Sequence, residues 1–195
     1  MRRSLIVVPG VVLVLALALA GCGSSGSGAT SASSAFGNIQ FTLPGVDTSP
    51  TSTPAMPVRY TCDGKDISPA MEWGTVPVGT KELAIFLISI STAVSKGFTP
   101  VWAMAGVNPE LHKLAAGEMP RGAFLGYNGK RLGRYSLCPP KGENATYQFG
   151  IYSLRPSVRP THHFEDNELL KVIASGPSPT SATAGGGLRV TYTRK

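Results

Sequence analysis

The residues best able to do chemistry lie between positions 60 and 73, where a short polar loop carries Cys62, Asp63, Asp66 and Ser68. Carboxylates accept hydrogen bonds and attract cations, and a serine hydroxyl both donates and accepts. The bond between Ser68 and Pro69 disfavours a helix there, because the residue before proline is pushed toward extended backbone. This combination is typical of a shaped surface site. Turn-forming residues of the same kinds also make ordinary strand connections, in which aspartates bond nearby backbone amides.

Catalysis is one alternative for this loop. A hydrolase could be assembled from Ser68, a histidine and Asp63 or Asp66. The chain has no G-x-S-x-G turn that would expose a nucleophile, so we expect the protein not to be an enzyme. None of its histidines has a metal-ligand spacing such as H-E-x-x-H, and we expect neither a metal nor another cofactor.

Buried strands are needed to hold such a loop in place. Near-continuous apolar runs predict two strands buried on both faces, at 83–90 and 101–107. Apolar alternation predicts further strands at 36–43, 57–61, 147–154 and 188–192. We expect one turn of helix at 110–117, an amphipathic helix at 165–174, and Gly/Pro-rich loops at 117–134 and 176–187. Many short strands with one or two short peripheral helices predict a mainly β protein, an antiparallel β-sandwich.

The N-terminal residues predict export and lipid anchoring. Two arginines precede an apolar run, residues 5–20, which ends in the sequence L-A-G-C. This pattern is typical of a bacterial lipoprotein signal peptide, with Cys22 as the lipidated residue. The alternative is an uncleaved membrane anchor, but the run of 16 residues falls short of the ~20 that a span needs. We therefore expect a signal peptide at 1–21, a lipidated cysteine and Gly/Ser-rich tether at 22–35, and a folded domain at 36–195.

The charge of the chain fits a membrane surface better than a nucleic acid. Removal of residues 1–21 takes away two arginines and lowers the formal charge from +7 to +5. The remaining basic residues form no cluster interleaved with aromatic residues, so we expect no nucleic-acid partner. A mild positive charge suits the outer face of the cytoplasmic membrane or the cell envelope, where the lipid would hold the protein.

The order of residues 62–73, C-D-G-K-D-I-S-P-A-M-E-W, resembles the opening signature of the phosphatidylethanolamine-binding protein family. It is most similar to the bacterial branch often labelled Raf-kinase-inhibitor-like. Later stretches continue the resemblance: P-V-G-T-K at 77–81, W-A-M-A-G-V-N-P at 102–109, G-A-F-L-G-Y-N at 122–128, C-P-P-K-G at 138–142 and Y-Q-F-G-I-Y-S-L at 147–154. The resemblance covers residues 36–195 and implies a β-sandwich with a small anion pocket on its rim.

Most polar groups of that family pocket are replaced in this chain. Where the family has an aspartate pair, this sequence has Ser89 and Ser91. The family's two histidines correspond to Val101 and Ala145, and its Gly-Pro pair corresponds to Ser136 and Leu137. Of the pocket's polar groups only Tyr147 matches. Because charge-assisted donors are lost, we expect a weakly bound small anionic or neutral polar ligand, or a lipid headgroup, rather than tightly held phosphate.

The resemblance gives a set of pocket candidates: Asp63, Asp66, Ser68, Ser89, Ser91, Val101, Ser136, Leu137, Cys138, Pro139 and Tyr147. Two functions stay open. One is a small-ligand or lipid-headgroup binding module with a diverged pocket. The other is a protein-interaction or structural domain whose pocket is vestigial, and the two differ in whether Val101 and Leu137 fill the pocket.

Cys62 and Cys138 are the two cysteines that remain if Cys22 is lipidated. In an oxidising compartment such a pair is a candidate disulfide. Both cysteines fall in motifs that the family brings together around its site. We therefore predict a Cys62–Cys138 bond, which the chain-entropy model values at ~4.5 kcal/mol.

Overall fold

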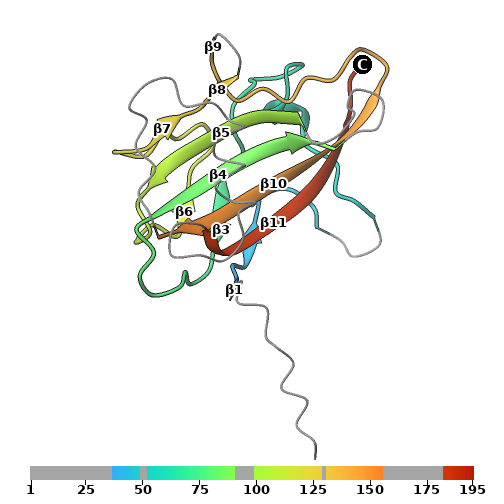
Figure 1. Ribbon diagram of the computed structural model, residues 1–195. Coiled ribbons are helices and arrows are strands. Elements are labelled where there is room, and N and C mark those ends of the chain that lie inside the picture. The colour runs from blue at the N-terminus through green and yellow to red at the C-terminus, as the bar shows by residue number, and fades with distance from the viewer. Residues whose placement is uncertain (1–36, 49–51, 91–98, 129–130, 156–181) are drawn as a thin grey trace, which may run out of the picture. The chain divides into compact units, whose positions relative to one another are not determined.

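The computed structural model of the protein describes residues 37–48, 52–90, 99–128, 131–155 and 182–195. The larger sheet has the order β1 (Gly37–Asn38), β11 (Ala182–Thr193), β10 (Asn144–Leu154), β4 (Glu82–Ser89), β5 (Thr99–Val107) and β7 (Phe124–Leu125). Only the β1–β11 pair in it is parallel. Figure 1 shows β11, β10, β4 and β5 side by side as long twisted ribbons.

A smaller antiparallel sheet packs against the larger one. It contains β2 (Phe41–Thr42), β3 (Met71–Trp73) and β6 (Lys113–Leu114), and a separate hairpin joins β8 (Tyr127–Asn128) to β9 (Arg131–Leu132). Phe41, Met71 and Trp73 of the smaller sheet share one apolar core with Leu87 and Phe149 of the larger sheet. The described residues therefore form the predicted mainly β sandwich.

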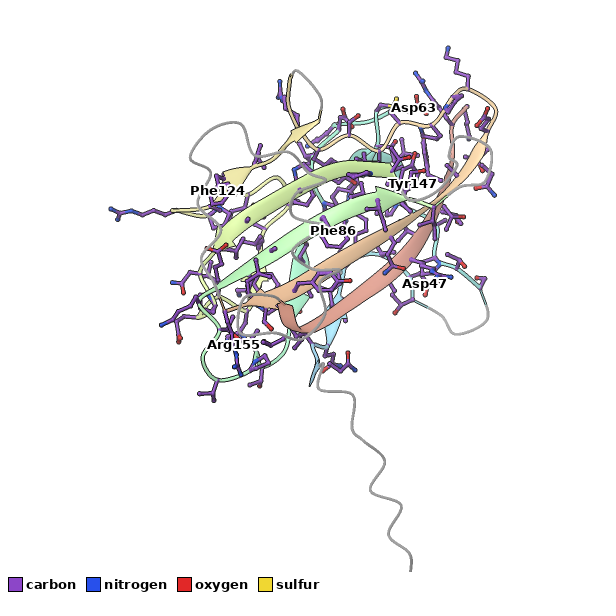
Figure 2. The ribbon with its side chains drawn as sticks, in the orientation of Figure 1. Asp47, Asp63, Phe86, Phe124, Tyr147 and Arg155 are labelled. Atoms are coloured by element: carbon purple, nitrogen blue, oxygen red, sulfur yellow. A yellow bond between two sulfur atoms is a disulfide. The ribbon has the colours of Figure 1, made fainter. Side chains whose placement is uncertain are left out.

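Strand β4 is buried along its whole length, as its apolar run predicts. Leu83, Ile85 and Leu87 enter the core between the sheets. The alternate residues form a second apolar cluster on the opposite face, where Phe86 stacks on Tyr152 with ring centroids 5.1 Å apart (Figure 2). A strand with both faces covered excludes water from its hydrogen bonds, so β4 is a rigid base for the loops at its ends.

Two predicted elements are wrong for local reasons. Residues 57–61 contain a 3-10 turn at Val58–Tyr60 instead of a strand, since the Thr61 amide and hydroxyl both donate to the Val58 carbonyl. Residues 110–117 contain β6 instead of a helical turn. The Asn108 side chain accepts the Glu110 amide at 2.9 Å and turns the chain, which then pairs with β3.

The predicted loop at 176–187 is also wrong from residue 182 on, where β11 begins. Gly186 and Gly187 are used here for close approach to neighbouring backbone. A Cβ added to Gly186 would lie 1.8 Å from the Ile39 carbonyl oxygen, so no larger residue fits. The predicted helix at 165–174 lies outside the described residues.

Candidate functional site

Backbone hydrogen bonds within the segment 59–66 fix the conformation of the loop that follows the 3-10 turn. The Gly64 and Asp66 amides both donate to the Thr61 carbonyl, at 2.9 and 3.2 Å, and the Lys65 amide donates to the Arg59 carbonyl. Gly64 is required for close packing, because a Cβ there would lie 2.2 Å from the Val58 carbonyl oxygen. The loop is therefore a preformed structure that presents its side chains in fixed positions.

Three contacts fasten this loop to the segment before β10. The predicted Cys62–Cys138 disulfide is present, and the Cα atoms of the two residues are 5.3 Å apart. The Cys62 amide donates to the Leu137 carbonyl at 3.3 Å, and the buried Tyr135 hydroxyl donates to the Tyr60 carbonyl at 3.0 Å. The disulfide therefore joins two segments that are also hydrogen-bonded to each other, residues 60–62 and 135–138, and we call this line of contacts the seam.

Asp63 belongs to this seam. Its carboxylate accepts hydrogen bonds from the Tyr192 hydroxyl and from Arg194 Nε, which lies 3.4 Å from Oδ1. Arg194 also donates to the carbonyl of Pro139, the residue after Cys138. The Tyr192 hydrogen bond and the Arg194 charge hold the pKa of Asp63 below its ordinary value. Asp63 thus links the loop to the end of β11 and, through Arg194, to Pro139, which is a structural role. Figure 2 shows Asp63 at the same end of the large sheet as Tyr147.

Beside the seam lies a pocket with a volume of about 150 Å³. It contains two of the predicted candidates, Asp66 and Ser68. The other lining residues come from β5, β7, the turn at 117–119 and the segment after β9: Trp102, Met104, Gly117, Glu118, Met119, Leu125, Arg134 and Tyr135. The Gly117 amide donates to the Ser68 carbonyl at 2.9 Å, so two walls of the pocket are bonded to each other.

Asp66 is the unusual residue of this pocket. Its backbone has φ of 51°, the only positive value at a non-glycine residue within the described ranges. Its Oδ1 atom is buried and has no hydrogen-bond partner there. A buried carboxylate oxygen without a donor is costly, since its lost hydration is not replaced. A ligand that brings a donor to this oxygen would remove that cost.

The aromatic wall is formed by Trp102 and Tyr135. Their rings meet edge to face with centroids 5.7 Å apart, and both residues are buried. Burial, with the nearby Asp66 charge second, raises the pKa of Tyr135, so its hydroxyl stays protonated at any physiological pH. The phenol therefore acts only as a hydrogen-bonding group.

Two charged residues, Glu118 and Arg134, complete the lining, and both are exposed. Glu118 accepts the Ala115 amide at 2.6 Å. The sequence gives little signal for either residue, because they lie in irregular segments without periodicity. Trp102 and Tyr135 look like ordinary core aromatics in the sequence, and only the fold brings them to Asp66.

The other predicted candidates lie elsewhere. Ser89 and Tyr147 are paired across β4 and β10, and burial raises the pKa of Tyr147 to about 12. Leu137 is fully buried and Val101 packs against the core. Ser136 is half-buried, Cys138 is exposed and Pro139 is buried, and none of these residues lines the Asp66 pocket. Ser91 lies outside the described residues.

Two features are absent from the described ranges, a cluster of metal ligands and a membrane-spanning helix. No group of three or more histidine, cysteine, aspartate or glutamate side chains there could hold a metal ion. No helix in those ranges is long and apolar enough to cross a membrane.

Comparison with known proteins gives a consistent family. The model of the family described as phosphatidylethanolamine-binding protein matches residues 46–183. A UPF0098 protein of Methanothermobacter thermautotrophicus is 38% identical over 105 residues, which are 51% of this chain and 68% of the relative. A UPF0098 protein of Aquifex aeolicus is 31% identical over 106 residues, 51% of this chain and 60% of the relative. The alignments therefore leave about 32% of the first relative and 40% of the second unmatched.

A solved structure gives the same fold. Escherichia coli YbcL, described as a new member of the mammalian PEBP family, superimposes with a TM-score of 0.66. The comparison covers 81% of this chain and 99% of YbcL at 21% identity. At 21% identity this likeness concerns the fold alone, since proteins that share a fold can differ in their sites.

Proposed function

The chain belongs to the phosphatidylethanolamine-binding protein family, and on that premise we propose that it is a non-enzymatic binding protein for a small ligand. The pocket beside Asp66 is its binding site. One observation carries the proposal: the pocket has a buried carboxylate oxygen that lacks a hydrogen-bond donor. Groups of this kind are rare in folded proteins and often mark a place for a ligand or water.

The anion pocket of the family is, in this proposal, diverged. Its histidine positions hold Val101 and Ala145, which cannot donate to an oxyanion. Leu137 and Ala145 are almost fully buried in the apolar core, at 0% and 2% exposure. Apolar side chains in these positions oppose phosphate binding, because they replace none of its hydration.

Lipid anchoring outside the cytoplasm is the second part of the proposal. It rests on the L-A-G-C sequence that ends at Cys22 and on the apolar run before it. The Cys62–Cys138 disulfide supports export, since such bonds persist in oxidising compartments. A diacylglyceryl group at Cys22 would supply the two chains that stable membrane anchoring needs.

A structural or protein-interaction domain with a vestigial pocket is the second candidate. The burial of Leu137 supports it, because this residue stands at a pocket position of the family and is fully buried in the core. Val101, the other residue of that criterion, packs against the core but is only half-buried. The second candidate predicts that small ligands do not change the stability of the folded domain. The two candidate functions therefore differ in whether a small ligand raises the stability of the folded domain.

The test is a thermal-unfolding screen of the full chain, purified in detergent, against phosphate, small amines, small alcohols and headgroup analogues. A ligand that binds only the native state stabilises it by about 1.4 kcal/mol at ten times its Kd. That is a rise in Tm of ~3–6 °C for a domain of this size. A screen in which no compound raises the Tm would favour the vestigial-pocket domain.

A further inference from the structure

We propose that the folded domain docks onto an anionic lipid bilayer through one end of its larger sheet. The inference rests on the proposed lipid anchoring at Cys22 and adds the protein surface that faces the lipid. We call this surface the docking end, and it comprises the turn at 77–80, Lys81, Arg155 and the start of β1. None of these residues lines the Asp66 pocket.

The register of the strands places these residues at one end of the sheet. Gly37 of β1 pairs with Ala184 of β11, and Ala184 pairs with Ser153 of β10. Ser153 in turn pairs with Leu83 of β4. β1 begins in this row, β4 begins one residue before it and β10 ends one residue after it. The chain before β1, the chain before β4 and the chain after β10 therefore all leave the sheet at the same end.

The predicted tether arrives at this end. Residues 23–36, 14 in number, join Cys22 to Gly37. For a Gly/Ser-rich chain of that length the expected root-mean-square span is ~20 Å. The 11 residues of β10 extend over ~35 Å, so a lipid at Cys22 keeps the docking end nearer to the bilayer than the opposite end of the sheet. Figure 2 shows Arg155 at the docking end and Asp63 at the opposite one.

The tip of the docking end is an exposed valine. The Thr80 amide and hydroxyl both donate to the Pro77 carbonyl and close a tight turn around Val78 and Gly79. Gly79 has a φ of 87°, which a type II turn requires at its third position. Val78 is 97% exposed, the highest value among the exposed large apolar side chains of the described ranges. Its side chain can therefore enter a lipid interface without any rearrangement of the sheet.

Two cations flank this valine. Lys81 follows the turn, and its amide donates to the carbonyl of the last residue of β10, next to Arg155. Both basic side chains are exposed. Glu110, in the turn after β5, is an exposed acid of the same end, whereas Lys113 and Glu72 face each other across β6 and β3 and cancel. The exposed charges of these described segments therefore balance to plus one, with the cations beside the valine.

An anionic bilayer fits this combination. An apolar side chain gains free energy in the lipid interface, and lysine and arginine are attracted to anionic headgroups. One valine and two cations bind a free vesicle only weakly. The tether compensates, because it gives these contacts a high effective concentration at the membrane.

The test uses the full lipidated chain in vesicles of equal parts phosphatidylglycerol and phosphatidylcholine. Thr75→Cys carries a fluorophore, and lipids with a nitroxide on the headgroup quench it at close range. Thr75 is exposed and lies within ~10 Å of Val78 along the chain. Lys141→Cys is the matched position, exposed in the turn that precedes β10 at the opposite end. We expect quenching at position 75 to exceed that at position 141 by at least about threefold, because the tether favours the docked state.

Variants in the Thr75→Cys chain identify the side chains that dock. Val78→Ser should lower the docking constant about fivefold, whereas Val58→Ser, at the exposed valine of the 3-10 turn near Asp63, should leave it unchanged. Lys81→Gln should lower it about fivefold in the anionic vesicles and not in vesicles of phosphatidylcholine alone. Equal quenching at positions 75 and 141, or no effect of Val78→Ser, would overturn the inference.

Failure of the anchor is visible separately. Lipidation blocks the Cys22 thiol and the disulfide blocks Cys62 and Cys138, so the chain without an added cysteine should take up no fluorophore. Uptake at Cys22 would mean that the anchoring and the docking both fail. A chain that is anchored but equally quenched at the two positions refutes the docking alone. Self-quenching at position 75 that grows with protein concentration in detergent would assign the surface to a second copy and overturn the inference.

Discussion

Loss of the Cys62–Cys138 disulfide should strongly lower the free energy of unfolding while leaving the apolar core intact. The bond joins residues 76 positions apart, which closes a loop of 77 residues. For a loop of that length the chain-entropy model gives ~4.5 kcal/mol, because the unfolded chain regains the freedom that the bond removes. The hydrogen bonds from Cys62 to Leu137 and from Tyr135 to Tyr60 remain possible without it. We therefore expect the double variant Cys62→Ser, Cys138→Ser to fold but to unfold more easily.

The assay is urea unfolding of the oxidised chain, the chain reduced with dithiothreitol, and the double serine variant. With a slope of ~2 kcal/mol/M, a loss of ~4.5 kcal/mol lowers the midpoint by ~2 M. The reduced chain and the serine variant should agree, since both lack only this bond. A midpoint that falls by less than about 0.5 M would contradict the reasoning, as would free thiols titrated in the unfolded, unreduced chain.

Three other predictions follow from the described contacts. Gly64→Ala should destabilise the fold by ~2–4 kcal/mol, because its Cβ would lie 2.2 Å from the Val58 carbonyl oxygen. Gly74→Ala is the control, since its Cβ would meet Gln40 Cβ at an ordinary contact distance of 3.5 Å and neither glycine has a positive φ. Asp63 has a pKa below its ordinary value of 3.8, so its stabilising effect is full above that pH and is lost as the pH falls through the lowered pKa. Asp63→Asn should therefore be less stable than the unsubstituted chain at pH 6 and equally stable near pH 2, and an equal difference at both pH values would exclude the titration. Cys22→Ser should release the protein from the membrane fraction, and retention there would mean that residues 5–20 act as a span.

The sequence predicts the interior of the sheet well and its irregular parts poorly. The prediction for residues 83–90 is confirmed, because a short apolar run that contains isoleucine and phenylalanine favours a strand covered on both faces over a longer helix. Residues 57–61 alternate like a strand, yet the Thr61 side chain closes a 3-10 turn. Glycines 185–187 look like a loop, because their role depends on backbone contributed by residues far away in the chain.

The candidate site likewise contains residues that the sequence predicts and residues that it does not. Asp66 and Ser68 stand out by residue type, and the structure brings both to one pocket. Their partners Trp102 and Tyr135 are aromatic residues in apolar surroundings, and nothing in their spacing distinguishes a pocket wall from the core. Arg134 and Glu118 lie in segments whose path is set by the sheet and not by local preference.

The position of β11 has a consequence for how the chain folds. β11 lies between β1 and β10, and Gly37 of β1 pairs with Ala184, 147 residues later in the sequence. At ~5–20 residues per second, a ribosome needs ~7–30 s to make that interval. During this time β1 lacks its partner, and β10, once it has been made, lacks one neighbour. Such non-local pairing makes folding slow. The order of strands thus leaves the larger sheet incomplete until β11 has been made, and an incompletely folded chain is what the proposed export would have to move.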